Sequence, residues 1–340
     1  MIFPKREPIY QNLNTSFTNF GELLVDLKEN SFTGVVQVSF WEYEGVLLLD
    51  NGNIINAVQE VNGNVVTGSD AVTAVTDKAK EKDGAVSVYH QKGEMITMLA
   101  SVARSELLYG NLSAEFTSLE ALISKLQNEE HTGYIEVTFE ANNQRGYIFL
   151  LAGQVIEALF SAYGEEASKA AVLNQILTMT TTGGATLNVY QAAVEDALSE
   201  SEVINVSYNL PQLLKVWGAV ISAIESSVDK ALGKNVFLNT FKDTLIARAD
   251  DYPFLDPFAA KFQYKDGVVT FTGEVRKNFS QAIGTCLNET IDTLAERMAL
   301  DGKDLYGPVR AALAPVISEY QDLLDRFNFR GIIPDLIGEN

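Results

Sequence analysis

The sequence predicts an α+β protein, with two tandem small antiparallel-sheet α/β modules followed by a mostly helical domain with a β-hairpin. Three observations predict this fold class. Residues 12–40 recur at 111–139, so one structural unit is present twice. Within each copy, apolar and polar residues alternate at the period of a strand. After residue 199 the apolar residues change to helical spacing. We therefore expect domains at 1–100, 101–200 and 201–340.

The repeat is defined by ordered matches at a nearly constant offset. The Thr33-Gly34 pair recurs 99 residues later as Thr132-Gly133, and Phe17-Thr18 recurs as Phe116-Thr117. A two-residue insertion in copy two then changes the offset to 101. Matches continue at that offset as Gly45 with Gly146, Gly52 with Gly153, Ile55 with Ile156, Ala57 with Ala158, and Val88-Tyr89 with Val189-Tyr190. Two copies of one fold explain this order.

Each copy is expected to begin with a short amphipathic helix. Leucines lie at helical spacing in residues 23–27 and again in residues 119–126. Thr18 and Thr117 are expected as N-caps, because a side-chain oxygen there can accept a hydrogen bond from the unpaired first-turn amides.

Three strands are expected to follow the helix. In the first, at 35–40 of copy one, apolar and polar side chains alternate, which predicts a sheet covered on one face. The second, at 45–49, is apolar throughout and should be central, and the third lies at 54–57. A helix and a final strand complete each copy, at 69–82 and 85–89 in copy one and at 165–179 and 185–190 in copy two.

Glycines indicate the turns of the predicted fold. The Asn51-Gly52 pair predicts a type I′ hairpin between the second and third strands, because both residues accept the positive φ that this turn requires. Copy two keeps only the glycine of the pair. The glycines that we expect to be structural at turns are Gly34, Gly52, Gly133, Gly153 and Gly267.

The succession of Thr-Gly, strand, Gly, apolar strand, turn Gly and Ile-x-x-Ala resembles the bacterial domain DUF4388, also called PATAN. The resemblance covers residues 12–92 and 111–193, and its motifs are mostly structural glycines and apolar positions. It implies a non-catalytic module of bacterial signalling and motility proteins, often beside receiver domains. Copy one departs from the pattern at 61–68, which is glycine-rich where the family has a helix.

The C-terminal third predicts a helical bundle with one β-hairpin around Gly267. An apolar stripe from Leu213 to Ile224, with Pro211 in the first turn, predicts the first helix, and three more are expected at 236–249, 279–300 and 308–327. Burying every stripe and the hairpin aromatics is a large apolar load for one bundle. We therefore expect a possible homodimer through residues 205–340, with complete internal burial as the alternative.

Composition limits the function classes. The chain of 340 residues has one cysteine and no apolar run long enough to span a membrane, which favours a cytoplasmic protein. A net charge of −20 without any basic cluster argues against nucleic acid as a partner. The acidity is explained by solubility alone or by docking onto a basic partner surface.

No catalytic, metal-binding or cofactor-binding site is expected. His90 and His131 occupy different positions of the repeat, and too few histidines and cysteines are present to bind zinc. Cys286 lies in an apolar helical stretch and should be buried. The acidic pairs Glu165-Glu166 and Asp250-Asp251 should be solvated.

Aromatic residues are the candidate interface residues. Trp41 and Tyr43 follow the first strand of copy one, and Tyr252, Phe254 and Phe258 lie in a proline-interrupted segment. Packing inside the protein is the alternative for both groups. We expect a non-enzymatic scaffold or adaptor that binds protein partners in a bacterial signalling, motility or cell-organisation system. A sensor for a small apolar ligand and an enzyme of unfamiliar type are the alternatives.

Overall fold

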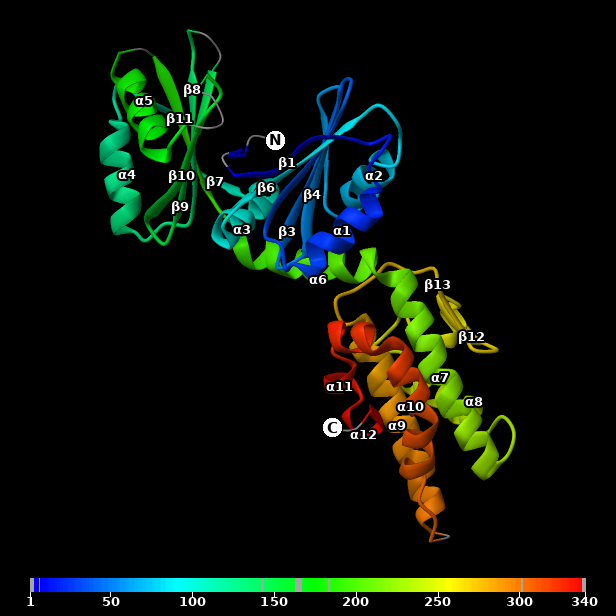
Figure 1. Ribbon diagram of the computed structural model, residues 1–340. Helices are drawn as coiled ribbons and strands as arrows, with labels where there is room; N and C mark the ends of the chain where they lie inside the picture. The colour runs from blue at the N-terminus through cyan, green and yellow to red at the C-terminus, as the bar shows by residue number, and fades with distance from the viewer. Residues whose placement is uncertain are drawn as a thin grey trace. The chain divides into compact units, whose positions relative to one another are not determined.

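The computed structural model describes residues 3–5, 7–141, 144–162, 167–182, 184–300 and 302–337. The chain divides into two compact units, Met1–Asn205 and Val206–Asn340. Unit 1 contains both copies of the repeat, and unit 2 contains helices and one β-hairpin (Figure 1). The predicted α+β fold class is therefore confirmed.

Copy one, which runs from strand β1 to helix α3, is a six-stranded antiparallel sheet with helices. The strand order is β1-β6-β2-β3-β4-β5, so β3 is internal, as the sequence predicts. The elements are β1 (Pro8–Asn14), α1 (Phe20–Glu29), β2 (Gly34–Phe40), β3 (Tyr43–Asp50), β4 (Asn53–Val61), β5 (Asn64–Thr67), α2 (Ser69–Lys78), β6 (Ala85–His90) and α3 (Gly93–Ser101).

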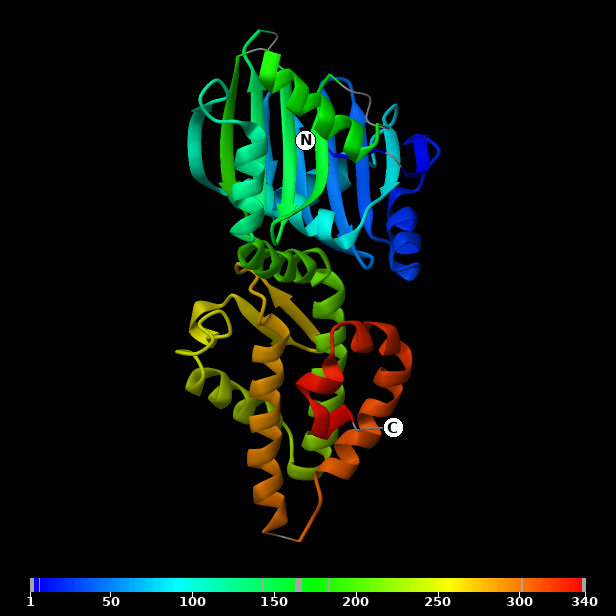
Figure 2. The ribbon, with the colours of Figure 1, turned by 90° about the vertical axis from the view of Figure 1, so that its left-hand side faces the viewer.

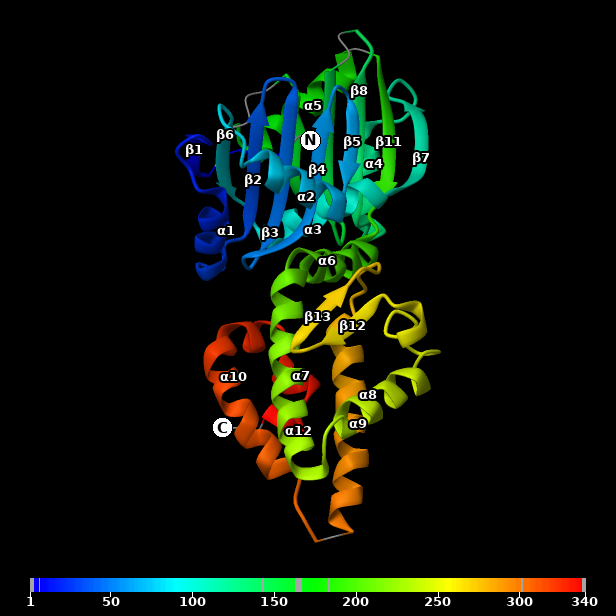
Figure 3. The same ribbon diagram turned by 90° about the vertical axis from the view of Figure 1, so that its right-hand side faces the viewer.

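In copy two, which runs from strand β7 to helix α6, the described strands have the order β7-β11-β8-β9-β10, which matches β1-β6-β2-β3-β4 of copy one. Its elements are β7 (Glu106–Ser113), α4 (Leu119–Asn128), β8 (Gly133–Phe139), β9 (Gln144–Leu151), β10 (Gln154–Phe160), α5 (Lys169–Thr182), β11 (Ala185–Gln191) and α6 (Val194–Tyr208). Figure 2 shows α4 and α5 in front of this sheet, and Figure 3 shows α1 and α2 in front of the sheet of copy one.

The expected N-caps, Thr18 and Thr117, were wrong. The first-turn caps are Asn19 and Ser118, whose side chains accept hydrogen bonds from the amides of Glu22 and Ala121. Thr18 instead belongs to the preceding turn, where its amide donates to the carbonyl of Asn14. The glycine-rich segment of copy one, where the DUF4388 pattern has a helix, contains the edge strand β5.

Both faces of the sheets are covered, whereas the alternating pattern predicted one. Helices α1 and α2, and α4 and α5, cover the first face of each sheet, while the second faces and helix α3 contribute to a shared apolar cluster. In this junction Val35 and Leu48 of copy one are buried, as are Tyr134 and Phe149 of copy two. The polar residues of the pattern lie inside the junction too, where Gln37 is buried and donates to the carboxylate of Glu44.

The threonines of the Thr-Gly pairs and the turn glycines both stabilise the hairpin turns. The hydroxyl of Thr33 accepts the amide of Asn51 at 3.0 Å, and Thr132 accepts the amide of Ala152 at 2.9 Å. Asn51 and Gly52 have φ of 47° and 74°, as a type I′ turn requires. In the same way Gly153 and Gly267 follow a residue of positive φ in their hairpins.

Gly34 and Gly133 are not turn residues. They are the first residues of β2 and β8, and their φ angles are not positive. A Cβ atom on Gly34 would lie 2.2 Å from the carbonyl oxygen of Tyr89, and one on Gly133 would lie 2.0 Å from that of Tyr190. Glycine is required here because a neighbouring backbone is so close.

Helix α6 begins in copy two and ends against copy one. Ile204, near its C-terminal end, is buried in the apolar core of copy one together with Leu24 and Val75. Glu200 of the same helix forms an ion pair with Arg104 at 2.9 Å. The expected domain boundary at 200/201 therefore falls inside a continuous helix that holds unit 1 together.

Unit 2 surrounds one apolar core that includes the fully buried Trp217. Leu213, Ile224 and Leu313 of the predicted stripes are buried in this core, whereas Val316, Ile317 and Tyr320 pack against it half-buried. Gly218 permits the turn of the hairpin to approach, since a Cβ there would lie 2.5 Å from the carbonyl oxygen of Gly267. The elements are α7 (Leu210–Leu232), α8 (Val236–Ala247), β12 (Phe262–Lys265), β13 (Val268–Phe271), α9 (Phe279–Ala299), α10 (Tyr306–Arg326), α11 (Phe329–Ile332) and α12 (Pro334–Ile337).

Candidate functional site

Of the two aromatic candidate interface residues in copy one, Trp41 is exposed to solvent and Tyr43 packs within the protein. The side chain of Trp41 is 89% exposed in the turn between β2 and β3. Tyr43 is half-buried, packs edge-on against Phe40, and donates from its hydroxyl to the side chain of Gln59 at 3.3 Å. Burial raises the pKa of Tyr43 to about 12, with the Glu81 carboxylate adding to the shift. Tyr43 therefore has a structural role.

The proline-interrupted segment of unit 2 divides in the same way. Phe254 is buried and stacks on Phe279 with 5.9 Å between ring centroids, and Tyr252 is half-buried beside it. Phe258, in a short 3-10 turn at Pro257–Ala259, is 83% exposed. Phe258 is thus the aromatic of this segment that is available to a partner.

The most exposed aromatic residues of unit 1 include a pair that the repeat relates. Phe17 is 91% exposed and Phe116 is 90% exposed, at equivalent positions between the first strand and the first helix of their copies. Neither ring contributes to a core. The matching Phe-Thr pairs are visible in the sequence, but the alternation and leucine patterns concern burial and do not mark them as exposed.

The same turn presents both phenylalanines. The Phe17 amide donates to the carbonyl of Asn14 at 3.0 Å, and the Phe116 amide donates to that of Ser113 at 3.1 Å. One residue earlier, the amides of Ser16 and Glu115 donate to the side chains of Asn14 and Ser113. Since side chain and backbone both restrain this turn, each ring is held outward by an ordered backbone.

A groove of 550 Å³ lies beside Phe116. It is formed by the β7–α4 turn, the start of α4 and the last turn of α5. Its charged lining residues are two carboxylates, Glu115 and Glu120, and its polar lining includes the hydroxyls of Thr180, Thr181 and Thr182. No Lys or Arg is among the described residues that line it. The groove is therefore acidic at its rim and apolar next to the ring.

A second cleft, of 410 Å³, lies within unit 1 where the two copies meet. The His90 Nδ1 atom lies 3.0 Å from the carboxylate of Glu7, and the Lys169 ammonium donates to the carbonyl of Val155 at 2.9 Å. An apolar-ligand sensor would need a deep apolar pocket with few polar groups. This cleft is mostly polar instead, since its ionisable lining residues are Glu7, His90, Lys92, Glu94, Glu157 and Lys169.

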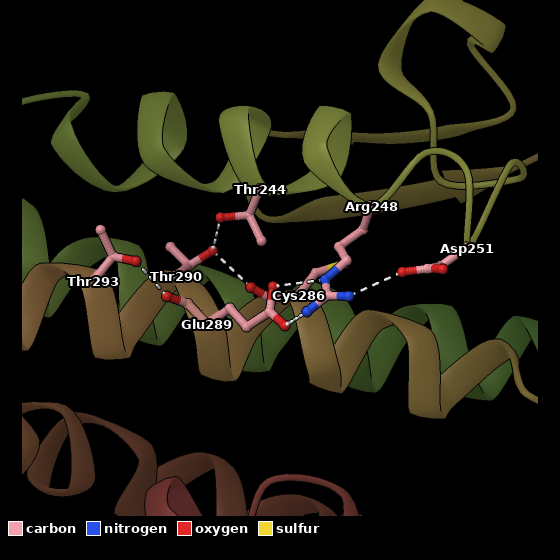
Figure 4. Close-up of polar contacts among 7 residues, drawn as sticks. All are labelled: Thr244, Arg248, Asp251, Cys286, Glu289, Thr290 and Thr293. Carbon is pink, nitrogen blue, oxygen red and sulfur yellow. Dashed lines mark hydrogen bonds and ion pairs between the residues drawn. The ribbon is translucent and has the colours of Figure 1, made fainter.

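The polar cluster around Cys286 in unit 2 is an interhelical contact (Figure 4). Arg248, which ends α8, forms a two-point ion pair with Glu289 of α9 and another with Asp251 at 2.9 Å. Cys286 is fully buried beneath them, and burial raises the pKa of its thiol to about 12. A thiol that stays protonated at neutral pH is a poor nucleophile.

The remaining titratable candidates do not converge. His131 is buried, with its Nε2 atom 3.1 Å from the carbonyl of Tyr190, whereas His90 is exposed. Among the described residues, no group of three or more His, Cys, Asp or Glu side chains could hold a metal ion. Asp250 is exposed and Asp251 is paired with Arg248, while the pair at 165–166 lies outside the described residues.

None of the helices in the described part of the chain is both long enough and apolar enough to cross a membrane.

Comparison with known families corrects the resemblance to DUF4388. A sequence model of a family described as "Uncharacterized protein conserved in archaea (DUF2226)" matches residues 1–103 and again residues 104–201, more than half of the chain. The chain therefore belongs to DUF2226, and the assignments to DUF4388 and to bacteria were wrong. Searches of curated proteins and of solved structures found no match.

The error has a physical origin. The residues that suggested DUF4388 are the Thr-Gly pair, the turn glycine and the apolar strand positions, and the fold itself requires them. Thr33 and Thr132 bind the hairpins, while Gly34 and Gly133 leave room for a neighbouring strand. Such positions identify a fold more readily than a family.

Proposed function

We propose that this DUF2226 protein is a non-enzymatic protein-interaction scaffold or adaptor, and that each copy of its repeat docks a partner through its exposed phenylalanine. The observation that supports the proposal is the recurrence of Phe17 as Phe116, each about nine-tenths exposed, in copies whose other surface residues have largely diverged. A phenylalanine left in water gains nothing from the fold, whereas burial against a partner would remove a large apolar area from solvent.

The distribution of charge favours a basic partner surface in the cytoplasm. Residues 1–205 contain 27 acidic and 11 basic residues, a net charge of −16, against 18 acidic and 14 basic residues and −4 in residues 206–340. A field of this strength attracts basic surfaces and repels nucleic acid. The interaction is therefore proposed to be with protein, with unit 1 as the docking part.

The exposed aromatics without a counterpart in the other copy are proposed as secondary contacts. Trp41 extends from the β2–β3 turn of unit 1, and Phe258 from the 3-10 turn of unit 2. Both have the exposure that an interface anchor needs in the free protein. Because neither is repeated, each would add to one docking event only.

Self-association through residues 205–340 stays a prediction, and the structure changes which residues would have to mediate it. Most residues of the helical stripes are buried, so a homodimer would depend mainly on exposed apolar residues such as Phe258, Val268 and Leu300. Light scattering on the full chain at micromolar concentration tests it. A monomer that stays a monomer on concentration would contradict it.

The docking proposal is tested by affinity purification from the native host. Wild type, Phe17→Ala, Phe116→Ala and the double variant are compared with Val25→Ala, a half-exposed apolar residue of α1 whose equivalent in copy two is Ser124. We expect the double variant to lose partners that Val25→Ala retains, with unchanged thermal melting. Retention of every partner by the folded double variant would contradict the proposal.

A further inference from the structure

The groove beside Phe116 has a chemistry of its own, which goes beyond a single exposed ring. We propose that it binds a basic segment of a partner protein, with an apolar side chain of the segment against Phe116 and a lysine or arginine side chain in the groove. This inference depends on the proposed docking function and specifies the partner of one of its two sites.

The three threonine hydroxyls of the groove already donate their protons inside the protein, whereas the hydroxyl of Ser118 accepts from the amide of Ala121. Thr180 donates to the carbonyl of Leu177 at 2.7 Å, Thr181 donates to that of Thr178 at 2.7 Å, and Thr182 donates into the same turn. A hydroxyl has a single proton, so these three oxygens keep only lone pairs for a ligand.

The other polar groups of the groove are acceptors or negative charges as well. The last turn of α5 lies at the negative end of the helix dipole, where carbonyls lack intrahelical donors. Glu115 and Glu120 have no ion pair within the part of the chain that the structure describes. The start of α4 offers little to an anion, because Ser118 caps it and Glu120 already supplies a negative charge in its first turn. The two carboxylates and the three threonine oxygens therefore favour a ligand that supplies donors and positive charge.

Neighbouring apolar residues explain why the ligand is a protein segment rather than a small cation. Phe116 stands at the rim, and Leu119 and Leu177 line the groove beside the carboxylates. Lysine and arginine combine an apolar stem with a charged end, and an adjacent apolar residue would cover the ring. The two carboxylates can pair with the charged end of such a side chain, and the apolar residues of the groove can contact its stem.

Copy one has the same phenylalanine but different charges nearby. The equivalent segment, from the end of α2 towards β6, contains Lys78, Lys80 and Lys82. Lys78 pairs with Glu81 at 2.6 Å and Lys80 pairs with Asp77 at 2.7 Å. This segment is balanced in charge, so a basic peptide should prefer copy two, and Phe17 provides a matched control inside the same chain.

The experiment measures binding of fluorescent peptides to the full chain by anisotropy. The probe is a short peptide of lysine and leucine, and its controls replace leucine with serine or lysine with glutamate. We expect the lysine–leucine peptide to bind best, and Phe116→Ala or the pair Glu115→Gln with Glu120→Gln to weaken it about tenfold or more, as for an interface anchor. Phe17→Ala should leave its dissociation constant unchanged.

Three results would overturn the inference. Equal binding of the lysine–serine peptide would show attraction by charge alone, and equal weakening by Phe17→Ala would show that copy two has no preference. Phe116-dependent binding to neutral lipid vesicles without binding to any peptide would show a membrane contact instead. If the peptide result fails while the double phenylalanine variant still loses its cellular partners, the groove assignment is wrong and the docking function stands.

Discussion

Copy one and copy two share a fold but differ in the residues at their junction and on their surfaces. Both keep the Thr-Gly pair, the turn glycine and an exposed phenylalanine. Copy one has the edge strand β5, which has no counterpart among the described residues of copy two. At the junction, Tyr134 and Tyr147 of copy two occupy the positions of Val35 and Val46 in copy one. What was kept twice is either needed for folding or fully exposed, and the exposed part is the better guide to function.

The largest effect is expected at the glycines that begin β2 and β8. A methyl group on Gly34 or Gly133 would lie 2.2 or 2.0 Å from a backbone carbonyl oxygen of the adjacent strand, which cannot move without separating the strands. We expect Gly34→Ala and Gly133→Ala each to cost about 4 kcal/mol or more of unfolding free energy, or to prevent folding. Urea denaturation measures this cost. A mild effect in one copy alone would show that the two copies are not built alike.

A smaller, graded effect is expected at the turn glycines. Gly52 and Gly63 both have positive φ, but a Cβ on Gly52 would lie 2.6 Å from the Cα of Lys28, whereas Gly63 has open space. Alanine should cost about 1 kcal/mol at Gly63 from backbone strain alone, and about 3 kcal/mol at Gly52 with the clash added. Gly153→Ala should match Gly52→Ala, because its Cβ would lie 2.6 Å from the Gln127 carbonyl oxygen. Equal melting temperatures for the Gly52 and Gly63 variants would disprove the turn–helix contact.

Alkaline pH should distinguish the copies through their tyrosines. Burial raises the pKa of Tyr134, Tyr147 and Tyr190 in copy two, and that of Tyr43 in copy one to about 12. Above the unfolded pKa of about 10 the unfolded chain loses these protons before the folded one, so stability is full below that pH and falls as pH rises. We expect Tyr134→Phe to lessen this fall more than Tyr43→Phe, as measured by chemical denaturation between neutral pH and the alkaline limit. A larger rescue by Tyr43→Phe would reverse the comparison.

The smallest effect on stability is expected at the exposed phenylalanines. Because neither ring touches a core, Phe17→Ala and Phe116→Ala should change the unfolding free energy by about 0.5 kcal/mol at most. Thermal melting measured by circular dichroism checks this. A clear loss of stability in either variant would give that ring a structural role and would remove it as evidence for docking.

The sequence predicted the elements that bury apolar residues locally and missed those that depend on distant partners. The repeat, the central strands and the Asn51-Gly52 turn follow from spacing and glycine chemistry. Strands β1 and β7 escaped the alternation pattern because they lie at the edges of their sheets, where most of their side chains are exposed. The burial of Val35 depends on helix α3 and on the other copy, and a local pattern of alternation reports neither.

The exposure of the candidate interface residues was predicted only in part. Trp41 and Phe258 are exposed, but Tyr43, Tyr252 and Phe254 pack within the protein, because an aromatic residue near a turn can fold back as easily as extend. In the sequence, Phe17 and Phe116 could be recognised as equivalent positions of the repeat, but not as exposed residues. Their exposure becomes apparent once the turn that holds them is known.

The course of helix α6 has a consequence for the order in which the protein is made. Domains commonly fold in sequence as they leave the ribosome, with the N-terminal one first. Here Ile204, a buried core residue of copy one, is synthesised only after the whole sheet of copy two. A nascent chain ending after α3 would expose the apolar site that Ile204 covers and would be open to chaperones or to aggregation. The core of the N-terminal copy is begun first but completed only after the sheet of the second copy has been made.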